Sequence, residues 1–290
     1  MSVRKPELYT SWNQEGHAVH FDGLRFIPTP LLARRWEGFN EVRMLGALLR
    51  REPGLTVLEI GCATGEMYRY VSRRHRQATY IGADISEPAV ARAREKFGAH
   101  ARFIVTDPSL AALDGLVPDI VFCRDVLQHQ TEPWAFLERL YRLAGRYLIM
   151  RIRTRDRGAT EYDPERSCQY HAGSWVPFIM VNVDELVETL GTRFQPMPSR
   201  IELLKDPIVL GGHQWRFVPK DCYETATGTA ETAMLLEKGH GTGARPTVAI
   251  SVRPDGEQTP GWSRMQRACR LSSMLVRGIV RHGYAGRTWW

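Results

Sequence analysis

Five residues of suitable type and spacing could bind a nucleotide-like ligand. Four of them stand at two-residue intervals, and the fifth lies 25 positions after the first: Glu59, Gly61, Ala63 and Gly65, then Asp84. An apolar run at 57–60 precedes the glycine turn, and a helical pattern follows it over 66–74. A strand, a glycine turn and a helix form the first step of a doubly wound sheet, whose strand ends hold ligands. Asp84 ends the next predicted strand, where a carboxylate can accept hydrogen bonds from both ribose hydroxyls. The pattern therefore predicts a nucleoside site.

The turn resembles the first motif of the class I S-adenosylmethionine-dependent methyltransferases. That motif is an acidic residue, one further residue and then spaced glycines, matched here by Glu59, Gly61 and Gly65. Ala63 stands where the family usually has a glycine. The resemblance covers roughly residues 55–150, and it implies S-adenosylmethionine as the cofactor.

A dinucleotide site is the competing interpretation of the same turn. Its G-x-G-x-x-G pattern would require glycines where this chain has Ala63 and Glu66. Glu66 would also bring a negative charge close to two phosphates. S-adenosylmethionine has a sulfonium, an ammonium and a carboxylate but no phosphate, so acidic residues are acceptable beside it. A glycine turn without any ligand is the remaining alternative.

The resemblance also implies roles for individual cofactor-binding residues. Asp84 would bind the ribose, Asp107 the adenine amino group, and the backbone near Arg124 the methionine portion. The predicted cofactor set is Glu59, Gly61, Cys62, Ala63, Gly65, Asp84, Ile85, Asp107, Pro108 and Arg124. For Asp107, a solvated loop aspartate is the alternative.

Catalytic candidates follow the fourth predicted strand, at 119–123. In the resembling family, residues just past this strand face the sulfonium, so Asp125 and His129 could reach the substrate. An imidazole titrates near pH 6.5 and can accept a proton at neutral pH, which suits His129 as a general base. A structural hydrogen-bonding role is the alternative. His171 is the third catalytic candidate.

Arginines at two-residue spacing mark the end of the fifth predicted strand, 147–152: Arg151, Arg153, Arg155 and Arg157. If the strand continues, their side chains share one face at the end where substrates enter. Arg153 would then bind a phosphate or carboxylate of the acceptor. The alternative is a solvated edge of an emerging loop.

Two insertions are expected near 154–180 and 205–230. Long irregular segments in a compact domain usually shape functional sites, so Tyr170, His171 and Trp175 are predicted to contact the acceptor. Cys168 and His171 lack the further ligands that a metal site needs, so no metal is expected.

The elements that position these residues indicate an α/β fold. We expect a doubly wound, mostly parallel seven-stranded sheet with helices on both faces, an N-terminal helical cover and a C-terminal basic helix. The predicted organisation is a cover segment at 1–50, a methyltransferase domain at 51–253 and an extension at 254–290. A helix is expected at 31–51 and another at 183–190. The strand at 194–204 has two candidate antiparallel partners, 232–238 and 247–253.

Composition and charge narrow the class of protein. The chain has 290 residues, 43% of them hydrophobic, and a formal net charge of +7. No apolar run approaches the ~20 residues that span a bilayer, and no signal-peptide segment is evident, which predicts a cytoplasmic protein. The five cysteines are scattered and are expected to be reduced: Cys62, Cys123, Cys168, Cys222 and Cys269.

The basic excess is concentrated in an amphipathic stretch near the C-terminus. Residues 262–290 hold six arginines and no acidic residue. An apolar face could dock on the protein or across a homodimer, lie on an anionic membrane surface, or leave the arginines to contact RNA. Docking is the favoured interpretation.

Together these features predict an S-adenosylmethionine-dependent methyltransferase that methylates a small molecule, with an anionic acceptor suggested by the arginines. The mechanism would be in-line displacement. The alternatives are a nucleic-acid methyltransferase, disfavoured because CRDVLQH follows the fourth strand where an N-P-P-Y-type motif would be needed, and a non-catalytic S-adenosylmethionine-binding protein.

Overall fold

A computed structural model describes residues 10–23, 27–171, 173–212, 214–223, 228–239 and 245–253. The chain divides into two compact units, 1–252 and 253–290. The predicted basic helix at 262–282 lies outside the described residues, as does Cys269. None of the helices in the described ranges is long and apolar enough to cross a bilayer.

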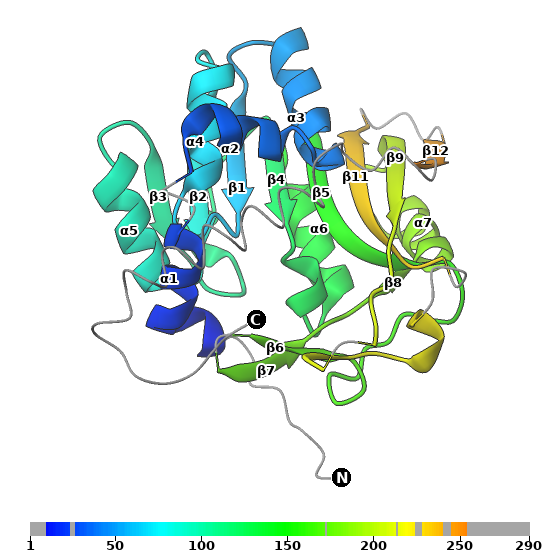
Figure 1. Cartoon of the computed structure of the whole chain (residues 1–290). Coiled ribbons are helices and arrows are strands. Elements are labelled where there is room, and N and C mark those ends of the chain that lie inside the picture. The colour runs from blue at the N-terminus through cyan, green and yellow to red at the C-terminus, as the bar shows by residue number, and fades with distance from the viewer. Residues whose placement is uncertain are drawn as a thin grey trace. The chain divides into compact units, whose positions relative to one another are not determined.

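A nine-stranded sheet forms the centre of the first unit (Figure 1). Its order is β12-β9-β11-β5-β4-β1-β2-β3, with β8 paired to β5. The strand bounds are β1 Thr56–Ile60, β2 Thr79–Asp84, β3 Arg102–Val105, β4 Ile120–Arg124, β5 Tyr147–Arg155, β8 Val181–Asn182, β9 Pro198–Pro207, β11 Ala230–Lys238 and β12 Thr247–Val252. Strands β1 to β5 pair in parallel, whereas β11 runs antiparallel between β5 and β9.

The sheet has two strands more than the predicted seven. Strand β5 runs on to Arg155, so the short β8 finds a parallel partner beside its last residues. Strand β12 pairs in parallel with β9 and adds an edge. Of the two candidate antiparallel partners for β9, β11 therefore takes that place.

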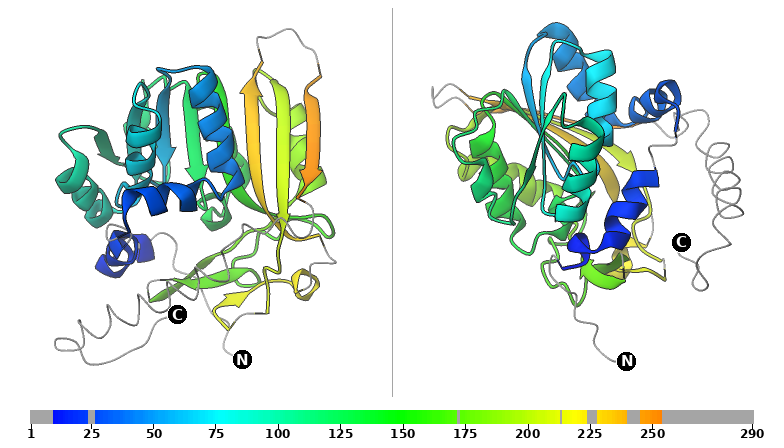
Figure 2. Two further views of the ribbon diagram at one scale, coloured as in Figure 1. Left: turned by 45° about the horizontal axis from the view of Figure 1, so that its top comes forward. Right: turned by 90° about the vertical axis from the view of Figure 1, so that its left-hand side faces the viewer.

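Helices cover both faces of the sheet, as predicted for a doubly wound fold (Figure 2). Their bounds are α2 Thr29–Trp36, α3 Asn40–Arg51, α4 Glu66–Arg74, α5 Glu87–Phe97, α6 Pro133–Leu143 and α7 Val183–Thr192. Alternate residues of β1 enter different cores: Val57 packs with α3, α4 and α5, whereas Leu58 packs with α6 and α7. A strand buried on both faces explains why 57–60 reads as a nearly continuous apolar run.

The N-terminal cover is built from short elements. The predicted helix at 31–51 is interrupted near Gly38 and becomes α2 and α3. Before them lie a short helix η1, Thr10–Asn13, and α1, Glu15–Asp22. Helix α1 packs against α5, where Lys96 Nζ lies 3.2 Å from Asp22 Oδ1 and Arg92 forms an ion pair with Glu15.

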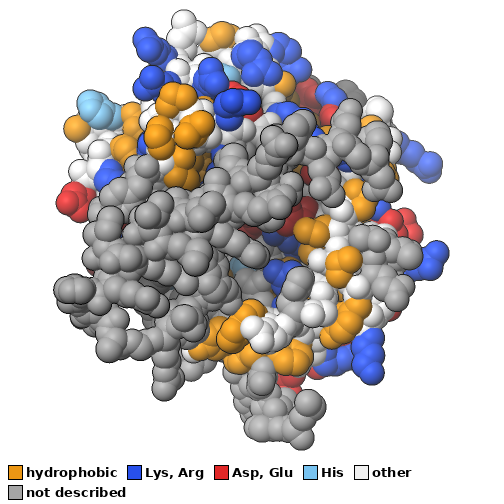
Figure 3. All heavy atoms as spheres, viewed as in Figure 1, with side chains coloured by type: hydrophobic (Ala, Val, Ile, Leu, Met, Phe, Trp, Pro, Cys, Tyr) orange, Lys and Arg blue, Asp and Glu red, His pale blue; other side chains and the backbone are white. Residues whose placement is uncertain are grey.

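The two predicted insertions meet in one three-stranded antiparallel sheet. It contains β6, Cys168–His171, and β7, Ser174–Pro177, from the first insertion, and β10, Arg216–Phe217, from the second. Its two faces differ because side chains alternate along a strand. Tyr170, Trp175 and Phe217 share one face, and hydrophobic side chains follow this sheet in Figure 3. His171 is on the other.

Candidate functional site

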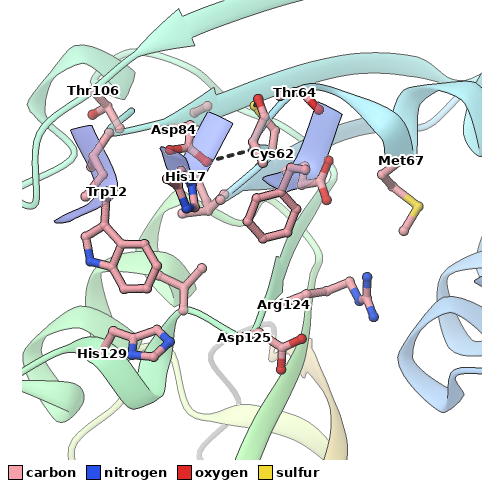
Figure 4. Close-up of a pocket in the computed structure, with 18 of the residues that line it drawn as sticks. Trp12, His17, Cys62, Thr64, Met67, Asp84, Thr106, Arg124, Asp125 and His129 are labelled. Atoms are coloured by element: carbon pink, nitrogen blue, oxygen red, sulfur yellow. Dashed lines mark hydrogen bonds between the residues drawn. The ribbon is translucent and has the colours of Figure 1, made fainter. Parts of the chain in front are cut away.

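A largely apolar pocket opens at the carboxyl ends of β1, β2 and β4 (Figure 4). Most of the predicted cofactor residues line it: Glu59, Gly61, Cys62, Ala63, Asp84, Ile85, Pro108 and Arg124. Asp125 and His129, predicted as catalytic, also belong to its wall. Parallel strand ends meet at one edge of the sheet, so residues distant in sequence come together there.

The glycine turn after β1 has left-handed backbone at alternate residues. Gly61 has a φ of 80°, Ala63 of 45° and Gly65 of 80°. A Cβ at position 61 would lie 2.5 Å from Val126 Cγ2, so this position admits only glycine without rearrangement. Ala63 adopts the conformation in which the resembling family usually has glycine, at a cost of about 1 kcal/mol. Gly65 precedes α4 and is not part of the pocket wall.

Asp84 ties the turn to the end of β2. Its Oδ2 accepts from the backbone N–H of Ala63 at 2.8 Å, and its Oδ1 accepts from that of Ser86 at 2.8 Å. Burial raises the pKa of this carboxyl group, and the backbone donors oppose the rise. Each carboxylate oxygen keeps a further lone pair, so Asp84 can also accept from ligand hydroxyls.

Acidic side chains dominate this side of the pocket. Burial raises the pKa of Glu59 to about 7, although a hydrogen bond from Tyr80 opposes the shift. Glu66 lies between two cations, with Oε1 2.6 Å from Lys96 Nζ and Oε2 2.7 Å from Arg69 Nη1. A pyrophosphate would meet these carboxyl groups, whereas a cationic sulfonium nucleoside is compatible with them.

Asp107 is placed differently from the prediction. It is exposed and not part of the pocket wall, because its Oδ1 accepts from the backbone N–H of Ser109 at 2.7 Å. Its neighbours Thr106 and Pro108 line the pocket instead. A local aspartate turn of this kind was the alternative that the sequence left open.

Arg124 joins the pocket to the N-terminal cover. Its Nε donates to Glu41 Oε1 at 2.7 Å, and its guanidinium carbon lies 4.6 Å from the ring centroid of Trp36 and 4.7 Å from that of Phe39. Trp36 is also a pocket residue. Helices α2 and α3 are thereby held at one side of the site.

The arginines of β5 are bound to carboxylates, contrary to both sequence interpretations. Arg151 and Arg153 are buried and form ion pairs with Asp125 and Glu231. Arg155 is buried and pairs with Asp221, whereas Arg157 is exposed beyond the strand. Arg153, predicted to bind substrate, is not part of the pocket wall because β11 supplies a carboxylate directly opposite it.

His129 is held as a neutral imidazole with a defined tautomer. Its Nδ1 lies 2.7 Å from the carbonyl oxygen of Pro177, so Nδ1 carries the hydrogen and Nε2 keeps a lone pair. Burial lowers the pKa of His129 to about 4, against the raising effect of that hydrogen bond. The side chain can therefore accept a proton at neutral pH.

Trp12 and His17 are pocket residues that were not among the predicted site residues, although the resemblance implies that the leading segment closes over the cofactor pocket. The Trp12 ring centroid lies 4.7 Å from that of His129 and 4.6 Å from that of His171. His17 Nδ1 lies 3.0 Å from His171 Nε2. The aromatic content of residues 12–21 was the available signal, but it carries no periodicity.

The third catalytic candidate and the two other acceptor candidates lie on the small sheet. His171 faces Trp12 and His17 from behind the pocket wall. Tyr170 and Trp175 make an edge-to-face contact on the opposite face, with ring centroids 5.5 Å apart. The structure brings His171 towards the site and places Tyr170 and Trp175 away from it, since alternate residues of a strand point to opposite faces.

Comparison with known proteins gives matches in the same region. Residues 58–146 match the family model described as "Methyltransferase domain". Trans-aconitate 2-methyltransferase of Variovorax paradoxus (strain S110) is 30% identical over 115 residues, which are 39% of this chain. The match spans 44% of that relative's length.

Solved structures show a similar fold at low sequence identity. A chain of the complex between the Haloferax volcanii Trm112 methyltransferase activator and a methyltransferase aligns with a TM-score of 0.50 and 16% identity, over 81% of this chain and 99% of that one. Magnesium protoporphyrin IX methyltransferase from Synechocystis PCC 6803, with S-adenosylmethionine bound, aligns with a TM-score of 0.48 and 19% identity. The alignment covers 79% of this chain and 93% of that one.

The family model covers β1 to β4, the strands whose ends build the pocket. The left-handed turn and the buried Asp84 suit a nucleoside without phosphates. Residues 58–146 of this chain are therefore similar to a methyltransferase domain, and they hold the strand ends that build the pocket.

Proposed function

We propose that the chain transfers a methyl group from S-adenosylmethionine to a small-molecule acceptor. The observation that carries this proposal is the arrangement of the pocket. Asp84 stands on one side and the pair Asp125 and His129 on the other (Figure 4). A nucleoside bound at Asp84 would extend its reactive end towards a carboxylate and a neutral imidazole.

Bound S-adenosylmethionine supplies an electrophilic methyl group, and the sulfur keeps the electron pair of the broken carbon–sulfur bond when an acceptor oxygen or nitrogen forms the new bond. The chain aligns the two molecules, which can contribute about 7–11 kcal/mol to lowering the barrier. His129 Nε2 takes the proton that a hydroxyl or amine acceptor loses. Asp84 binds the ribose hydroxyls, and backbone of the turn at 61–63 approaches the nucleoside.

The size and shape of the site favour a small acceptor. Trp12 and His17 from the N-terminal cover close one side of the pocket, and the Trp12 ring contacts that of His129, so the space left for the acceptor is limited. The trans-aconitate methyltransferase, which is similar to this chain over 115 residues, also acts on a small molecule by its name. Lys and Arg side chains gather instead near the ends of α3 and α4 (Figure 3), away from the pocket's aromatic wall.

The cofactor half of this proposal is tested by measuring S-adenosylmethionine binding to the wild type and to two variants, Asp84→Ala and Asp107→Ala. We expect Asp84→Ala to weaken binding by about 1–3 kcal/mol, because hydrogen bonds to the ribose are lost. Asp107→Ala is the matched variant, and its carboxylate is already engaged by Ser109, so its affinity should equal that of the wild type. Titration calorimetry measures both. Unchanged affinity in Asp84→Ala would remove that residue from the site, and loss in Asp107→Ala would restore the predicted adenine contact.

Methyl transfer itself is tested with an isotopically labelled methyl donor and a small-molecule extract of the source cells. The expected result is labelled product together with S-adenosylhomocysteine. Tight cofactor binding without label in any fraction would instead indicate a protein that binds the cofactor and does not turn it over.

A further inference from the structure

Two carboxylates and two guanidinium groups alternate in a closed ring beneath the end of β4. Asp125 Oδ1 lies 2.9 Å from Arg153 Nη1, and Arg153 Nη2 lies 3.0 Å from Glu231 Oε1. Glu231 Oε2 pairs with Arg151, whose Nη1 lies 3.5 Å from Asp125 Oδ2. The ring carries no net charge, so each buried guanidinium has its charge compensated.

Sheet register brings the four residues together. Arg151 and Arg153 are two residues apart on β5 and point to the same face. Glu231 on β11 is the direct cross-strand partner of Arg153, and it reaches Arg151 diagonally. Asp125 follows β4 and approaches from the other side of β5. Its φ of 57° is a left-handed conformation that is rare for a residue other than glycine.

Only one member of the ring belongs to the pocket wall. The Asp125 side chain is 37% exposed, whereas those of Arg151 and Arg153 are 10% and 9% exposed. Asp125 Oδ1 is buried and has no hydrogen-bond partner, although it forms an ion pair with Arg153, so Oδ2 is the carboxyl oxygen that a ligand could reach. Oδ2 is also the oxygen with the longer ion-pair contact. A ligand in the pocket therefore meets this oxygen and not the guanidinium groups behind it.

The charge state of Asp125 agrees with this geometry. Burial alone would raise the pKa of its carboxyl group, but Arg151, Arg153 and Arg124 lower the pKa by more. The carboxylate is therefore ionised at neutral pH. Beside it, His129 presents Nε2 as a second hydrogen-bond acceptor, because its Nδ1 hydrogen is bound to Pro177.

We propose that Asp125, held by Arg151, Arg153 and Glu231, selects acceptors that carry hydrogen-bond donors, and rejects anionic ones. The acceptor class is a neutral or cationic hydroxyl- or amino-compound with at least two donor groups. One donor is the nucleophile and gives its proton to His129. A neighbouring hydroxyl or ammonium donates to Asp125. This inference rests on the proposed methyl transfer and replaces the anionic acceptor that the arginine spacing suggested.

Ion-exchange fractionation of a small-molecule extract tests the acceptor class. Fractions from an anion and a cation exchanger at pH 7 are each incubated with the protein and labelled S-adenosylmethionine. We expect the methyl-accepting material to pass through the anion exchanger. Acceptor retained only by the anion exchanger would overturn the inference. Label in no fraction would contradict methyl transfer itself, and the inference would fall with it.

Acetate inhibition tests the ring directly, with the acceptor fraction as substrate. Wild-type protein should resist acetate, because Asp125 and Glu231 balance the charges of both guanidinium groups. Glu231→Gln leaves one guanidinium charge uncompensated, so acetate should inhibit it competitively against the acceptor, with a raised KM and a smaller effect on kcat. Glu237→Gln makes the same change near the other end of β11 and should behave as wild type. Competitive inhibition of the wild type by acetate, at the concentrations effective on Glu231→Gln, would overturn the proposal.

A third variant, Asp125→Asn, tests the carboxylate that would contact the acceptor. We expect kcat/KM for the acceptor to fall about 10- to 100-fold, because a charged hydrogen bond is replaced by a neutral one, while S-adenosylmethionine affinity stays within about twofold. Equal kcat/KM values for Asp125→Asn and wild type would contradict the role of Asp125. If this variant does not fold, the acetate experiment on Glu231→Gln still decides the matter.

Discussion

At the scale of single residues, burial and one backbone contact determine what His129 can do. A solvated imidazole would be partly protonated near pH 6.5 and could use either nitrogen as a base. Here the Pro177 carbonyl oxygen fixes the hydrogen on Nδ1, and burial keeps the ring neutral. The same imidazole is in ring contact with Trp12, so its plane is fixed as well. The geometry agrees with the role of a base that needs no prior deprotonation.

The pH dependence of activity and stability should show this shifted pKa. The folded-state pKa of about 4 lies below the ordinary 6.5, so protonation of His129 should lower the rate of methyl transfer only below about pH 4. Between pH 6.5 and 4 the unfolded chain binds the proton first, and the free energy of unfolding should decrease by about 3 kcal/mol as pH falls. Urea unfolding at pH 7 and 4.5 checks this. In His129→Gln, the decrease in the free energy of unfolding between these two pH values should be smaller by that amount.

The exposed His100 provides the matched control for this measurement. His100→Gln makes the same substitution on the surface, away from the pocket, and should leave the difference between the two pH values as in wild type. An acid limb of the activity profile near pH 6.5 would contradict a buried, neutral His129.

At the scale of elements, the turn between β1 and α4 is the part with the least freedom to vary. It must bend the chain sharply, leave its backbone accessible to a ligand and leave room for the Val126 side chain, which packs against Gly61. Backbone N–H groups of Gly61 and Cys62 both donate to the Ala83 carbonyl oxygen, at 2.8 and 3.1 Å. The turn is therefore fixed to the end of β2, and Asp84 holds it from the next residue. We therefore expect cofactor binding to leave the conformation of this turn unchanged.

Gly61→Ala should damage both stability and cofactor binding. The left-handed φ disfavours alanine by about 1–2 kcal/mol, and the new methyl group would lie within contact distance of Val126 Cγ2. We expect a loss of at least about 1 kcal/mol in the free energy of unfolding and weaker S-adenosylmethionine binding, measured by denaturation and calorimetry.

Gly191→Ala is the matched control for Gly61→Ala. Gly191 lies in α7, and a Cβ there meets no atom within 4 Å. The same substitution should therefore stabilise the protein by about 0.5–1 kcal/mol. Similar effects of the two changes would show that the turn tolerates a side chain.

At the scale of the whole molecule, the pocket and its support come from different parts of the sequence. The pocket wall is drawn from residues between Trp12 and Phe136. Apart from Asp125, the ion-pair ring comes from the later strands β5 and β11, and the small sheet that contacts His129 comes from β6, β7 and β10. The C-terminal half of the described chain thus holds Asp125 and His129 in place while the N-terminal half binds the nucleoside.

Removal of residues 254–290 should leave S-adenosylmethionine affinity unchanged, because the pocket wall among the described residues is complete by Phe136. Calorimetry on the full chain and on a chain ending at Arg253 makes the comparison. An affinity loss greater than about tenfold would show that the removed segment contributes to the cofactor site. Binding of a polynucleotide to the two proteins over a range of salt concentrations would separately show whether the six arginines of 262–290 contact nucleic acid.

The sequence by itself determined the features that depend on local order. The apolar run at 57–60, the glycine turn and the aspartate ending the next strand are neighbours along the chain. The doubly wound arrangement and the cofactor were therefore predictable, and most of the predicted cofactor residues line the pocket. Local pattern also gave His129 and Asp125, since both follow β4 directly.

Only the tertiary structure decided which charges meet. The spacing of Arg151, Arg153 and Arg155 correctly places them on one face of β5, but it cannot show that Glu231, on a strand 80 residues later, lies opposite Arg153. Likewise, the sequence does not reveal that Trp12 and His17 close the pocket, or that Tyr170 and Trp175 face away from it. Ion pairing and burial depend on contacts between distant segments, and the charge that an acceptor meets follows from those contacts.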